Sequence, residues 1–278
     1  MSAVAPRAPS ILFVGDIVGG LGRRTLLALL PRLCAEHDPT FVVVNGENAA
    51  GGLGITPRIA DELFAAGVDV ITLGNHTYQR REIFRYLDEH DAILRPANYL
   101  AAQPGHVSCV VARDGVRLGV VNLSGNVFLQ AGRPAFTEIE AVLGRLEGKV
   151  DHVLVDRHAE ATSEKVAMGW HLDGRVSVVV GTHTHVPTAD ARVLPGGTAY
   201  ITDVGMTGPR GGVIGVKREQ AIESLRTHMK IRYETAEEDP WLMGVLVGLG
   251  PRPLRAASIS PLLVPWDGAA AAAAPGSA

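Results

Sequence analysis

The sequence has few cysteines, no long apolar run and little excess of charge of either sign. Its two cysteines, Cys34 and Cys109, lie in apolar surroundings and do not form a pair with metal-ligand spacing. This excludes a zinc site built from thiolates and predicts buried free thiols in a reducing compartment. The formal net charge of -3 gives no global basic field, which argues against a broad nucleic-acid groove or an anionic membrane surface as partner.

Signals for membrane insertion or export are also missing. No span approaches the roughly 20 apolar residues of a membrane helix, and the stretch MSAVAPRAPS lacks the apolar core of a signal peptide. We therefore predict a cytoplasmic protein without a membrane partner. A chain of 278 residues with 46% hydrophobic residues suits one large domain. We place this domain at residues 10–265, with a flexible N-terminus at 1–9 and a disordered Ala/Gly tail at 266–278.

Short β-branched runs alternate with longer amphipathic stretches in the first 90 residues. This rhythm predicts parallel strands with helices on both faces. A turn at Asp114-Gly115 predicts a hairpin over 107–123, and the alternation then resumes. We expect an α/β sandwich with mixed sheets in the middle and helices outside. The other predicted strands are 11–14, 41–44, 68–73, 152–155, 175–180, 191–193 and 199–202, and the predicted helices are 21–36, one with Thr56 as N-cap, 78–90, 136–146 and 163–171.

Polar side chains come at the ends of five of the predicted strands. In open α/β sheets ligands gather beyond the carboxyl ends of the strands, so these side chains are predicted to meet at one edge. Each has an ordinary alternative as a helix cap, a turn residue or a surface histidine. Their coincidence at five strand ends favours a common site. The candidates are Asp16, Glu47, Asn48, Asn75, His76, His158, His183 and His185.

The stretch GTHTHVP at residues 181–187 places two of these histidines one residue apart after an apolar run. Side chains two residues apart point the same way in extended backbone. His183 and His185 are therefore predicted to reach one point if the chain stays extended there. Two solvated loop histidines are the alternative for such a pair taken alone.

The candidate donors mix carboxylates, amides and imidazoles without cysteine. This chemistry suits Mn²⁺, Fe or Zn in a catalytic site better than a closed structural zinc site. Eight candidate groups are too many for one tetrahedral ion. We therefore predict two metals, an arrangement that is used for phosphoester hydrolysis.

These residues resemble the motifs of the calcineurin-like metallophosphoesterases. Gly74-Asn75-His76 matches that family's Gly-Asn-His motif, and residues 181–185 match its Gly-His-x-His motif with Thr before the first His. Two departures are informative, because no histidine lies two residues after Asp16 and Glu47 stands where an aspartate would bridge the metals. The departures and two further stretches resemble the bacterial YmdB-type subfamily. Those stretches are 156–165 and 203–209.

The resemblance implies a calcineurin-like sandwich and a 2′,3′-cyclic-nucleotide 2′-phosphodiesterase with a di-iron or di-manganese centre, zinc and magnesium being the other candidate ions. A water between the metals would attack phosphorus. His76, beside a ligand, would donate a proton to the leaving oxygen. Ser124, Thr207 and Gly208 are further candidates for substrate contacts. The implied ligands are Asp16, Glu47, Asn48 and His185 for the first metal, and the bridging Glu47 with Asn75, His158 and His183 for the second.

Other interpretations of the sequence compete with this one. Residues 20–25, GLGRRT, approach a dinucleotide-binding motif, but Thr replaces its third glycine. Ser124 lies on no nucleophile elbow, which argues against a serine hydrolase. The main alternative is a regulatory protein that binds a nucleotide or a partner at a dinuclear metal site with little turnover. Arg157 stands where the subfamily has an aromatic residue, and we expect it to alter the pocket wall.

The expected substrate is a small phosphodiester or a cyclic nucleotide, and RNA ends are a further candidate. The apolar strands predicted after residue 190 are candidates for pairing between subunits, so a homo-oligomer is also a candidate state.

Overall fold

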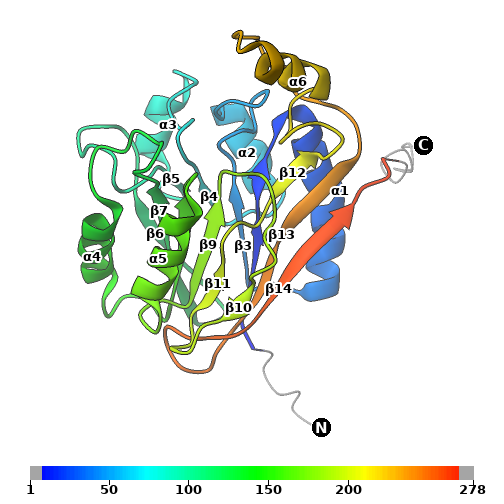
Figure 1. Cartoon of the computed structure of the whole chain (residues 1–278). Helices are drawn as coiled ribbons and strands as arrows, with labels where there is room; N and C mark the ends of the chain where they lie inside the picture. Colours follow the sequence, from blue (N-terminus) through cyan, green and yellow to red (C-terminus); the bar gives the residue numbers. More distant parts are fainter. Residues whose placement is uncertain (1–7, 269–278) are drawn as a thin grey trace.

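Two β-sheets form the centre of the computed structural model, which describes residues 8–268 (Figure 1). The first sheet has the order β2-β12-β13-β1-β3-β4-β5, with β14 paired to β13, and the second has the order β10-β11-β9-β8-β7-β6. The strands of the first sheet are β1 (Ser10–Val14), β2 (Asp16–Ile17), β3 (Phe41–Asn45), β4 (Val70–Thr72), β5 (Ile93–Leu94), β12 (Met206–Pro209), β13 (Pro240–Leu249) and β14 (Ala256–Pro265). Those of the second are β6 (Ser108–Arg113), β7 (Val116–Ser124), β8 (His152–His158), β9 (Val178–Thr182), β10 (Arg192–Val193) and β11 (Ala199–Ile201).

Both sheets are mixed, as predicted. In the first sheet β1, β3, β4 and β5 run parallel, while β13 runs antiparallel to β1. In the second sheet β7, β8, β9 and β11 run parallel, and β6 forms the predicted hairpin with β7. The parallel sets of the two sheets bring their carboxyl ends to the same end of the molecule, at the top of Figure 1.

The inner faces of the two sheets pack against each other in a shared apolar core. Ile11 and Phe13 of β1 contact this core, which also contains Val120, Leu154 and Val178 from the second sheet. The alternate residues of the same strands point outward, because successive side chains of a strand face opposite sides. Every residue of β1 is buried, which agrees with the continuous apolar run at residues 11–14 that follows Ser10.

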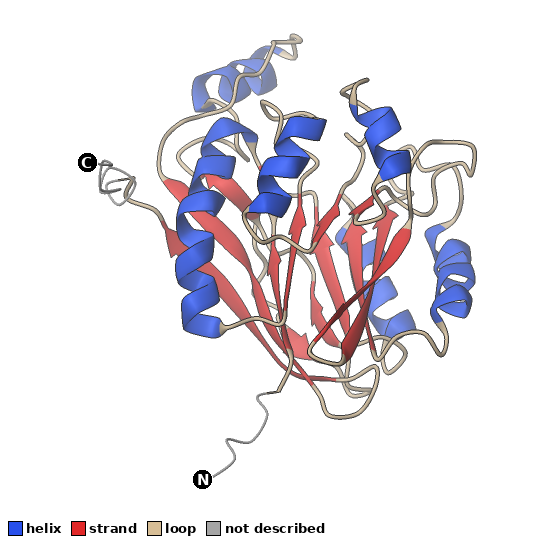
Figure 2. Ribbon diagram, turned by 180° about the vertical axis from the view of Figure 1, so that it is seen from behind, coloured by secondary structure: helices blue, strands red, loops and turns tan. Residues whose placement is uncertain are grey.

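Helices cover only the outer face of each sheet, so the prediction of helices on both faces is wrong (Figure 2). The first three helices pack on the first sheet and the next two on the second. A second sheet occupies each inner face, because the sandwich buries two apolar faces against each other. The helices are α1 (Gly19–His37), α2 (Pro57–Ala65), α3 (Ile83–Glu89), α4 (Ala135–Leu146), α5 (Thr162–Leu172) and α6 (Arg218–Thr227).

Several elements differ from the prediction. The helix expected at 78–90 begins only at Ile83, and Arg80 in the preceding turns donates hydrogen bonds to the backbone oxygens of Ala50 and Leu53. The strand expected at 175–180 starts at Val178 and continues to Thr182. No element was predicted at the positions of β2, β5, β12, α6, β13 or β14, although β13 occupies an interior position in the first sheet.

No helix in residues 8–268 is long and apolar enough to span a bilayer. Most of the predicted N-terminal and C-terminal flexible segments, at 1–9 and 266–278, lies outside the described residues.

Candidate metal centre

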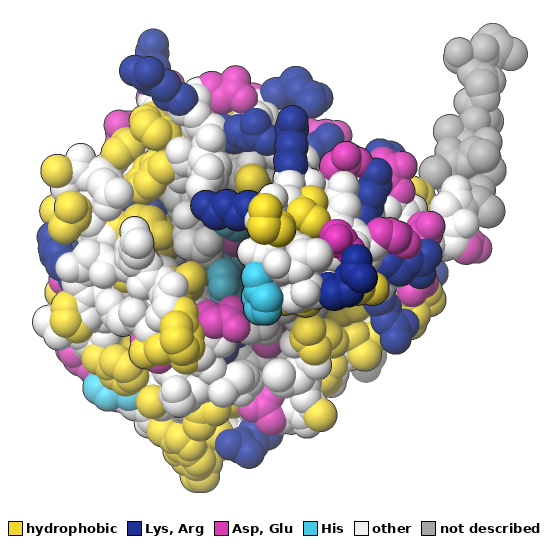
Figure 3. All heavy atoms as spheres, turned by 45° about the horizontal axis from the view of Figure 1, so that its top comes forward, with side chains coloured by type: hydrophobic (Ala, Val, Ile, Leu, Met, Phe, Trp, Pro, Cys, Tyr) yellow, Lys and Arg dark blue, Asp and Glu magenta, His cyan; other side chains and the backbone are white. Residues whose placement is uncertain are grey.

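All eight candidate side chains converge at the carboxyl ends of the strands, between the two sheets. The first sheet supplies Asp16 in β2, and the loops after β3 and β4 supply four more. The second sheet supplies His158 at the end of β8, with His183 and His185 just beyond β9. Figure 3 brings this end of the molecule forward and shows histidine side chains in and beside a hollow of its surface. The convergence predicted from the strand ends is therefore present in the structure.

One group of donors surrounds the imidazole of His158. Its Nε2 lies 3.0 Å from Glu47 Oε1, 3.0 Å from Asn75 Oδ1 and 3.0 Å from His183 Nδ1. Ligand atoms of Glu47, His158 and His183 all lie within 4.8 Å of one another. These four side chains are the ones expected to hold the second metal.

A second group of donors lies beside the first. His185 Nε2 lies 3.2 Å from Asn48 Nδ2 and 3.8 Å from Asp16 Oδ1. Asn48 Nδ2 also lies 3.2 Å from Glu47 Oε1, so Glu47 is placed between the two groups. The geometry agrees with the bridging position expected for Glu47.

The remote nitrogen of each imidazole has an acceptor, which leaves the other nitrogen for a ligand. His158 Nδ1 donates to Thr182 Oγ1 at 2.9 Å, and His185 Nδ1 donates to the Ile214 carbonyl at 2.8 Å. His183 Nε2 lies 3.1 Å from Glu160 Oε2. Metal-binding histidines usually have such an outer partner, which fixes the ring and its tautomer.

Asp156 supports this arrangement without being a candidate ligand. It is fully buried, and its Oδ1 accepts a hydrogen bond of 2.7 Å from the Thr182 hydroxyl that orients His158. Its Oδ2 accepts from Thr72 at 2.6 Å and from Asn45 at 3.0 Å. No role was predicted for Asp156 from the sequence. Its position two residues before His158, on the same face of β8, was the available signal.

The two histidines of residues 181–187 do not lie on extended backbone, so that part of the prediction is wrong. The strand ends at Thr182, and His183 and His185 have φ angles of 98° and 64°. This left-handed turn still presents both imidazoles to the site, one to each group of donors. Positive φ is uncommon for residues other than glycine and tends to occur at functional sites.

Gly74 allows its backbone to lie close to two candidate ligands. A Cβ atom there would lie 2.3 Å from His158 Nε2 and 2.4 Å from Glu47 Oε2. No side chain fits at these distances, so the candidate ligands require glycine before Asn75.

The two candidate carboxylates have opposite electrostatic environments. Burial raises the pKa of Asp16 to about 6, although His185 and His158 oppose this effect. Burial also favours a higher pKa for Glu47, but the close contact with His158 and the neighbouring His76 outweigh it and hold the pKa below its usual range. Glu47 is therefore the more strongly acidic of the two.

The surroundings of His158 and His183 also shift their pKa values in opposite directions. Burial opposes protonation of His158, but Glu47, Asp16 and Asp156 outweigh it and raise its pKa to about 9. Burial and the neighbouring His158 lower the pKa of His183 to about 3. Three buried carboxyl groups, Asp16, Glu47 and Asp156, thus lie around His158, and such a concentration of acidic groups favours a cation.

An unpaired carboxylate oxygen is a further feature of the donor set that fits divalent metal ions. Asp16 Oδ1 is buried without a hydrogen-bond partner, which is rare for a carboxylate oxygen in a folded protein. It lies 3.8 Å from His185 Nε2, the ring nitrogen that faces the candidate site. An ion between these groups would satisfy the oxygen.

His76 lies at the solvent side of the site. Its backbone N–H donates to Glu47 Oε2 at 2.9 Å, and its Nδ1 lies 2.8 Å from Asn48 Oδ1. The His76 side chain is 25% exposed, and burial lowers its pKa. It therefore contacts the candidate ligands and remains accessible to a substrate.

The three predicted substrate contacts differ in placement. Ser124 lies beside His158 in the register of β7 and β8. Thr207 is buried in β12 with its hydroxyl 3.4 Å from the Met243 carbonyl, and Gly208 packs against Val18. The structure gives the predicted roles of Thr207 and Gly208 no support.

Arg157 does not form part of a pocket wall, contrary to expectation. Its side chain is fully buried and donates hydrogen bonds to the Ser124 carbonyl and to Glu164 Oε1, the latter at 2.9 Å. The residue therefore joins α5 to the end of β7 inside the fold.

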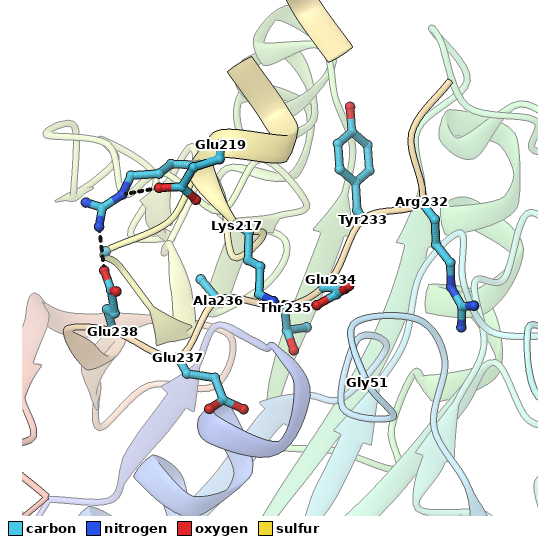
Figure 4. A pocket seen from close by; sticks show the side chains of 12 residues that line it. Gly51, Lys217, Glu219, Arg232, Tyr233, Glu234, Thr235, Ala236, Glu237 and Glu238 are labelled. Carbon is cyan, nitrogen blue, oxygen red and sulfur yellow. Dashed lines mark hydrogen bonds and ion pairs between the residues drawn. The ribbon is translucent and has the colours of Figure 1, made fainter. Parts of the chain in front are cut away.

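Two cavities lie near the candidate metal centre. One of about 820 Å³ has charged walls, with Lys217, Arg232 and Glu234 among its lining residues, and Gly51 forms part of its rim (Figure 4). It contains none of the candidate ligands. The other, of about 430 Å³, is mainly apolar and is bordered by His185.

Comparisons with known proteins agree with the resemblance in the sequence. The model of a family described as YmdB-like protein matches residues 12–262. The chain is 43% identical to the 2′,3′-cyclic-nucleotide 2′-phosphodiesterase of Bacillus subtilis (strain 168) over 257 residues, which cover 92% of this chain and 97% of the relative.

Two solved structures are also similar over nearly their whole length. A hypothetical protein from Thermus thermophilus has a TM-score of 0.86 and 37% identity, covering 92% of this chain and 99% of that chain. A novel phosphatase from Mycoplasma pneumoniae has a TM-score of 0.87 and 31% identity, covering 96% and 97%. The family match and these identities confirm the predicted membership: this chain belongs to the YmdB-like family.

Proposed function

We propose that this protein is a metal-dependent phosphodiesterase that hydrolyses the 2′-bond of 2′,3′-cyclic nucleotides. The observation that carries the proposal is the convergence of seven donor side chains from both sheets, one of which, Asp16, has a buried Oδ1 without a hydrogen-bond partner. The name and 43% identity of the Bacillus subtilis relative support the substrate class. The calcineurin-like character of the sandwich belongs to the same proposal.

The centre is proposed to hold two ions, iron or manganese before zinc or magnesium, because its donors are oxygen and imidazole nitrogen without thiolate. Asp16, Asn48 and His185 would hold one ion, and Asn75, His158 and His183 the other. Asn48 would bind through its amide oxygen, which requires rotation of the amide because that oxygen faces His76 in this structure. Glu47 would contact both, which follows from its position between the two groups of donors. Such a pair of ions neutralises phosphate charge and activates water.

The protein's own residues have separate tasks in this reaction. Glu47 stays ionised, because His158 and His76 hold its pKa down against the effect of burial. His76, at the exposed side of the donors, is proposed to donate a proton to the departing ribose 2′-oxygen. Its contact with Asn48 orients the ring and leaves its other nitrogen for the substrate. The product would be a nucleoside 3′-phosphate.

We also propose a single domain over residues 10–265 and a cytoplasmic location. RNA ends as substrates and a homo-oligomeric state stay predictions of the same kind.

The direct test combines metal analysis with a substrate panel. Purified protein, stripped by chelator and reloaded with Mn²⁺, is assayed on 2′,3′-cyclic AMP, 3′,5′-cyclic AMP and bis-p-nitrophenyl phosphate. We expect two metal ions per chain, chelator-sensitive turnover and release of the 3′-phosphate from the first substrate. Two bound ions without turnover of any substrate would instead favour the regulatory binding protein. A single closed tetrahedral metal would contradict the dinuclear centre.

A further inference from the structure

A buried ion pair lies directly behind the turn formed by His183, Thr184 and His185 (the histidine turn). Lys165 in α5 and Asp203, in the connection between β11 and β12, have side chains that are 1% and 0% exposed. Lys165 Nζ lies 2.7 Å from Asp203 Oδ2. Neither residue is among the proposed ligands, and the proposed reaction gives neither a task.

Asp203 connects this pair to the residue between the two histidines. Its Oδ2 accepts hydrogen bonds from the Thr184 backbone N–H at 3.1 Å and from the Thr184 hydroxyl at 2.7 Å. Its Oδ1 accepts from the Gly205 N–H at 2.9 Å. The carboxylate is therefore fixed at both oxygens, and three of its four contacts bear on Lys165 and Thr184.

The turn needs such an anchor because of its backbone conformation. His183 and His185 both have positive φ, and such backbone persists only where the surroundings determine it strongly. The two histidines that flank Thr184 make hydrogen bonds of their own. The His183 N–H donates to Asp16 Oδ2 at 3.1 Å, and His185 Nδ1 donates to the Ile214 carbonyl at 2.8 Å. Thr184 is the residue through which the Lys165–Asp203 pair holds the turn.

The charge of Lys165 compensates the buried carboxylate of Asp203. An ionised carboxylate removed from water is strongly unfavourable without a close cation and hydrogen bonds. The lysine reaches Asp203 past Gly181, where a Cβ atom would lie 2.9 Å from Lys165 Cδ and 1.7 Å from the Thr202 carbonyl. Gly181 opens the path for the lysine, two residues before His183.

We propose that the Lys165–Asp203 pair is a positioning device for the metal centre, which holds the His183-Thr184-His185 turn so that one imidazole faces each ion. The inference rests on the proposed function, because it assumes that these histidines bind metal. Lys165, Asp203 and Thr184 are therefore positioning residues. They affect metal binding only by holding the turn that presents His183 and His185.

The adjacent residue on α5 provides a matched control. Glu164 also forms a buried ion pair, with Arg157 at 2.9 Å, and its side chain is 11% exposed. That pair holds the loop after β7, because Glu164 accepts from the backbone N–H groups of Asn126 and Val127. It makes no contact with the histidine turn.

The test measures the Mn²⁺ affinity of the full-length protein by titration calorimetry, together with thermal unfolding of the metal-free protein. Lys165→Met/Asp203→Leu removes the pair without leaving an unpaired charge, and Thr184→Val removes one anchor while keeping the pair. We expect the double variant to bind Mn²⁺ about 10–100-fold more weakly, the usual effect of losing an outer partner of a ligand. Thr184→Val should show a smaller loss, and Lys165→Met/Asp203→Asn, which retains an acceptor for Thr184, should recover part of the affinity.

The control variant Arg157→Met/Glu164→Leu should lower the unfolding temperature but keep the Mn²⁺ affinity within about threefold, because Glu164 binds the loop after β7 and not Thr184. Equal losses of affinity in both double variants would mean that the Lys165–Asp203 pair acts only through general packing, which overturns the inference. If the Lys165→Met/Asp203→Leu protein fails to fold, an unchanged affinity in Thr184→Val overturns it. Wild-type protein that binds no Mn²⁺ would refute the proposed function, whereas normal wild-type binding with unaffected variants would refute only the positioning device.

Discussion

The two sheets contribute different chemistry to the candidate centre. The first sheet supplies the carboxylates and amides, Asp16, Glu47, Asn48 and Asn75, together with His76. The second supplies the imidazoles of His158, His183 and His185. We call these sets the oxygen half and the imidazole half. Each half is incomplete without the other, because the donors for either proposed ion come from both.

The two halves are held by different means. In the oxygen half, backbone groups fix the carboxylates: the His76 N–H donates to Glu47 and the His183 N–H donates to Asp16. In the imidazole half, each ring is fixed by an acceptor on its far side, such as Thr182 for His158. Substitutions in the oxygen half therefore remove charge from the ions directly, while substitutions around the imidazole half act through ring orientation.

The largest effect is expected from Glu47→Gln, which removes a charge shared by both proposed ions. Metal content and turnover should fall together, by more than the roughly 10–100-fold cost of losing an outer partner of a ligand. Metal analysis and the rate on 2′,3′-cyclic AMP check this on one preparation. A variant that kept two metals and a near-normal rate would show that Glu47 does not bridge.

The next largest effect is expected at His76, the one histidine of the oxygen half. His76→Ala should keep both metals and lose about 10²–10⁴-fold in rate on 2′,3′-cyclic AMP, the usual contribution of a positioned general acid. The loss should be smaller on bis-p-nitrophenyl phosphate, because nitrophenolate leaves without protonation. Equal losses on the two substrates would assign the proton to another group.

The pH dependence of Mn²⁺ affinity compares the two halves, because it shows which ligands release a proton when the metal binds. The pKa of His158 in the metal-free protein is raised to about 9, so below pH 9 a metal must displace its proton, and affinity should rise about tenfold per pH unit from 6 to 9. Below pH 6 the slope should steepen, because the pKa of Asp16 is raised to about 6. Glu47 and His183 should release no proton, since their pKa values are lowered. Mn²⁺ titrations in buffers of different ionisation enthalpy count the protons, and a flat profile would contradict this assignment.

The smallest effects separate two outer partners within the imidazole half. Thr182→Val removes the acceptor of His158 and should weaken Mn²⁺ binding by about 10–100-fold. Glu160→Gln should cost less than about tenfold, because the Glu160 side chain is 51% exposed and its interaction with His183 is screened by water. A larger loss for Glu160→Gln than for Thr182→Val would reverse this ranking of the two rings.

Much of the sandwich could be predicted from local patterns. The apolar runs of β1, β3 and β8 and the Asp114-Gly115 hairpin are short-range signals, and they appear in the structure close to the expected positions. The position of β13 could not be predicted in this way. It pairs with β1 across more than 200 residues of sequence, and no local pattern encodes which strand a segment joins.

The sequence by itself determined which side chains form the candidate centre, because residue type and position at a strand end are local properties. Asp16, Glu47 and His158 were all found from their place after apolar runs. Only the tertiary structure decided how those donors are held. The partner that fixes the His185 ring is the carbonyl of Ile214, and the amide that holds Asp156 belongs to Asn45, 111 residues away. The left-handed turn at His183 likewise depends on Lys165 and Asp203 from two other elements, because a strained backbone persists only where distant contacts outweigh its local preference.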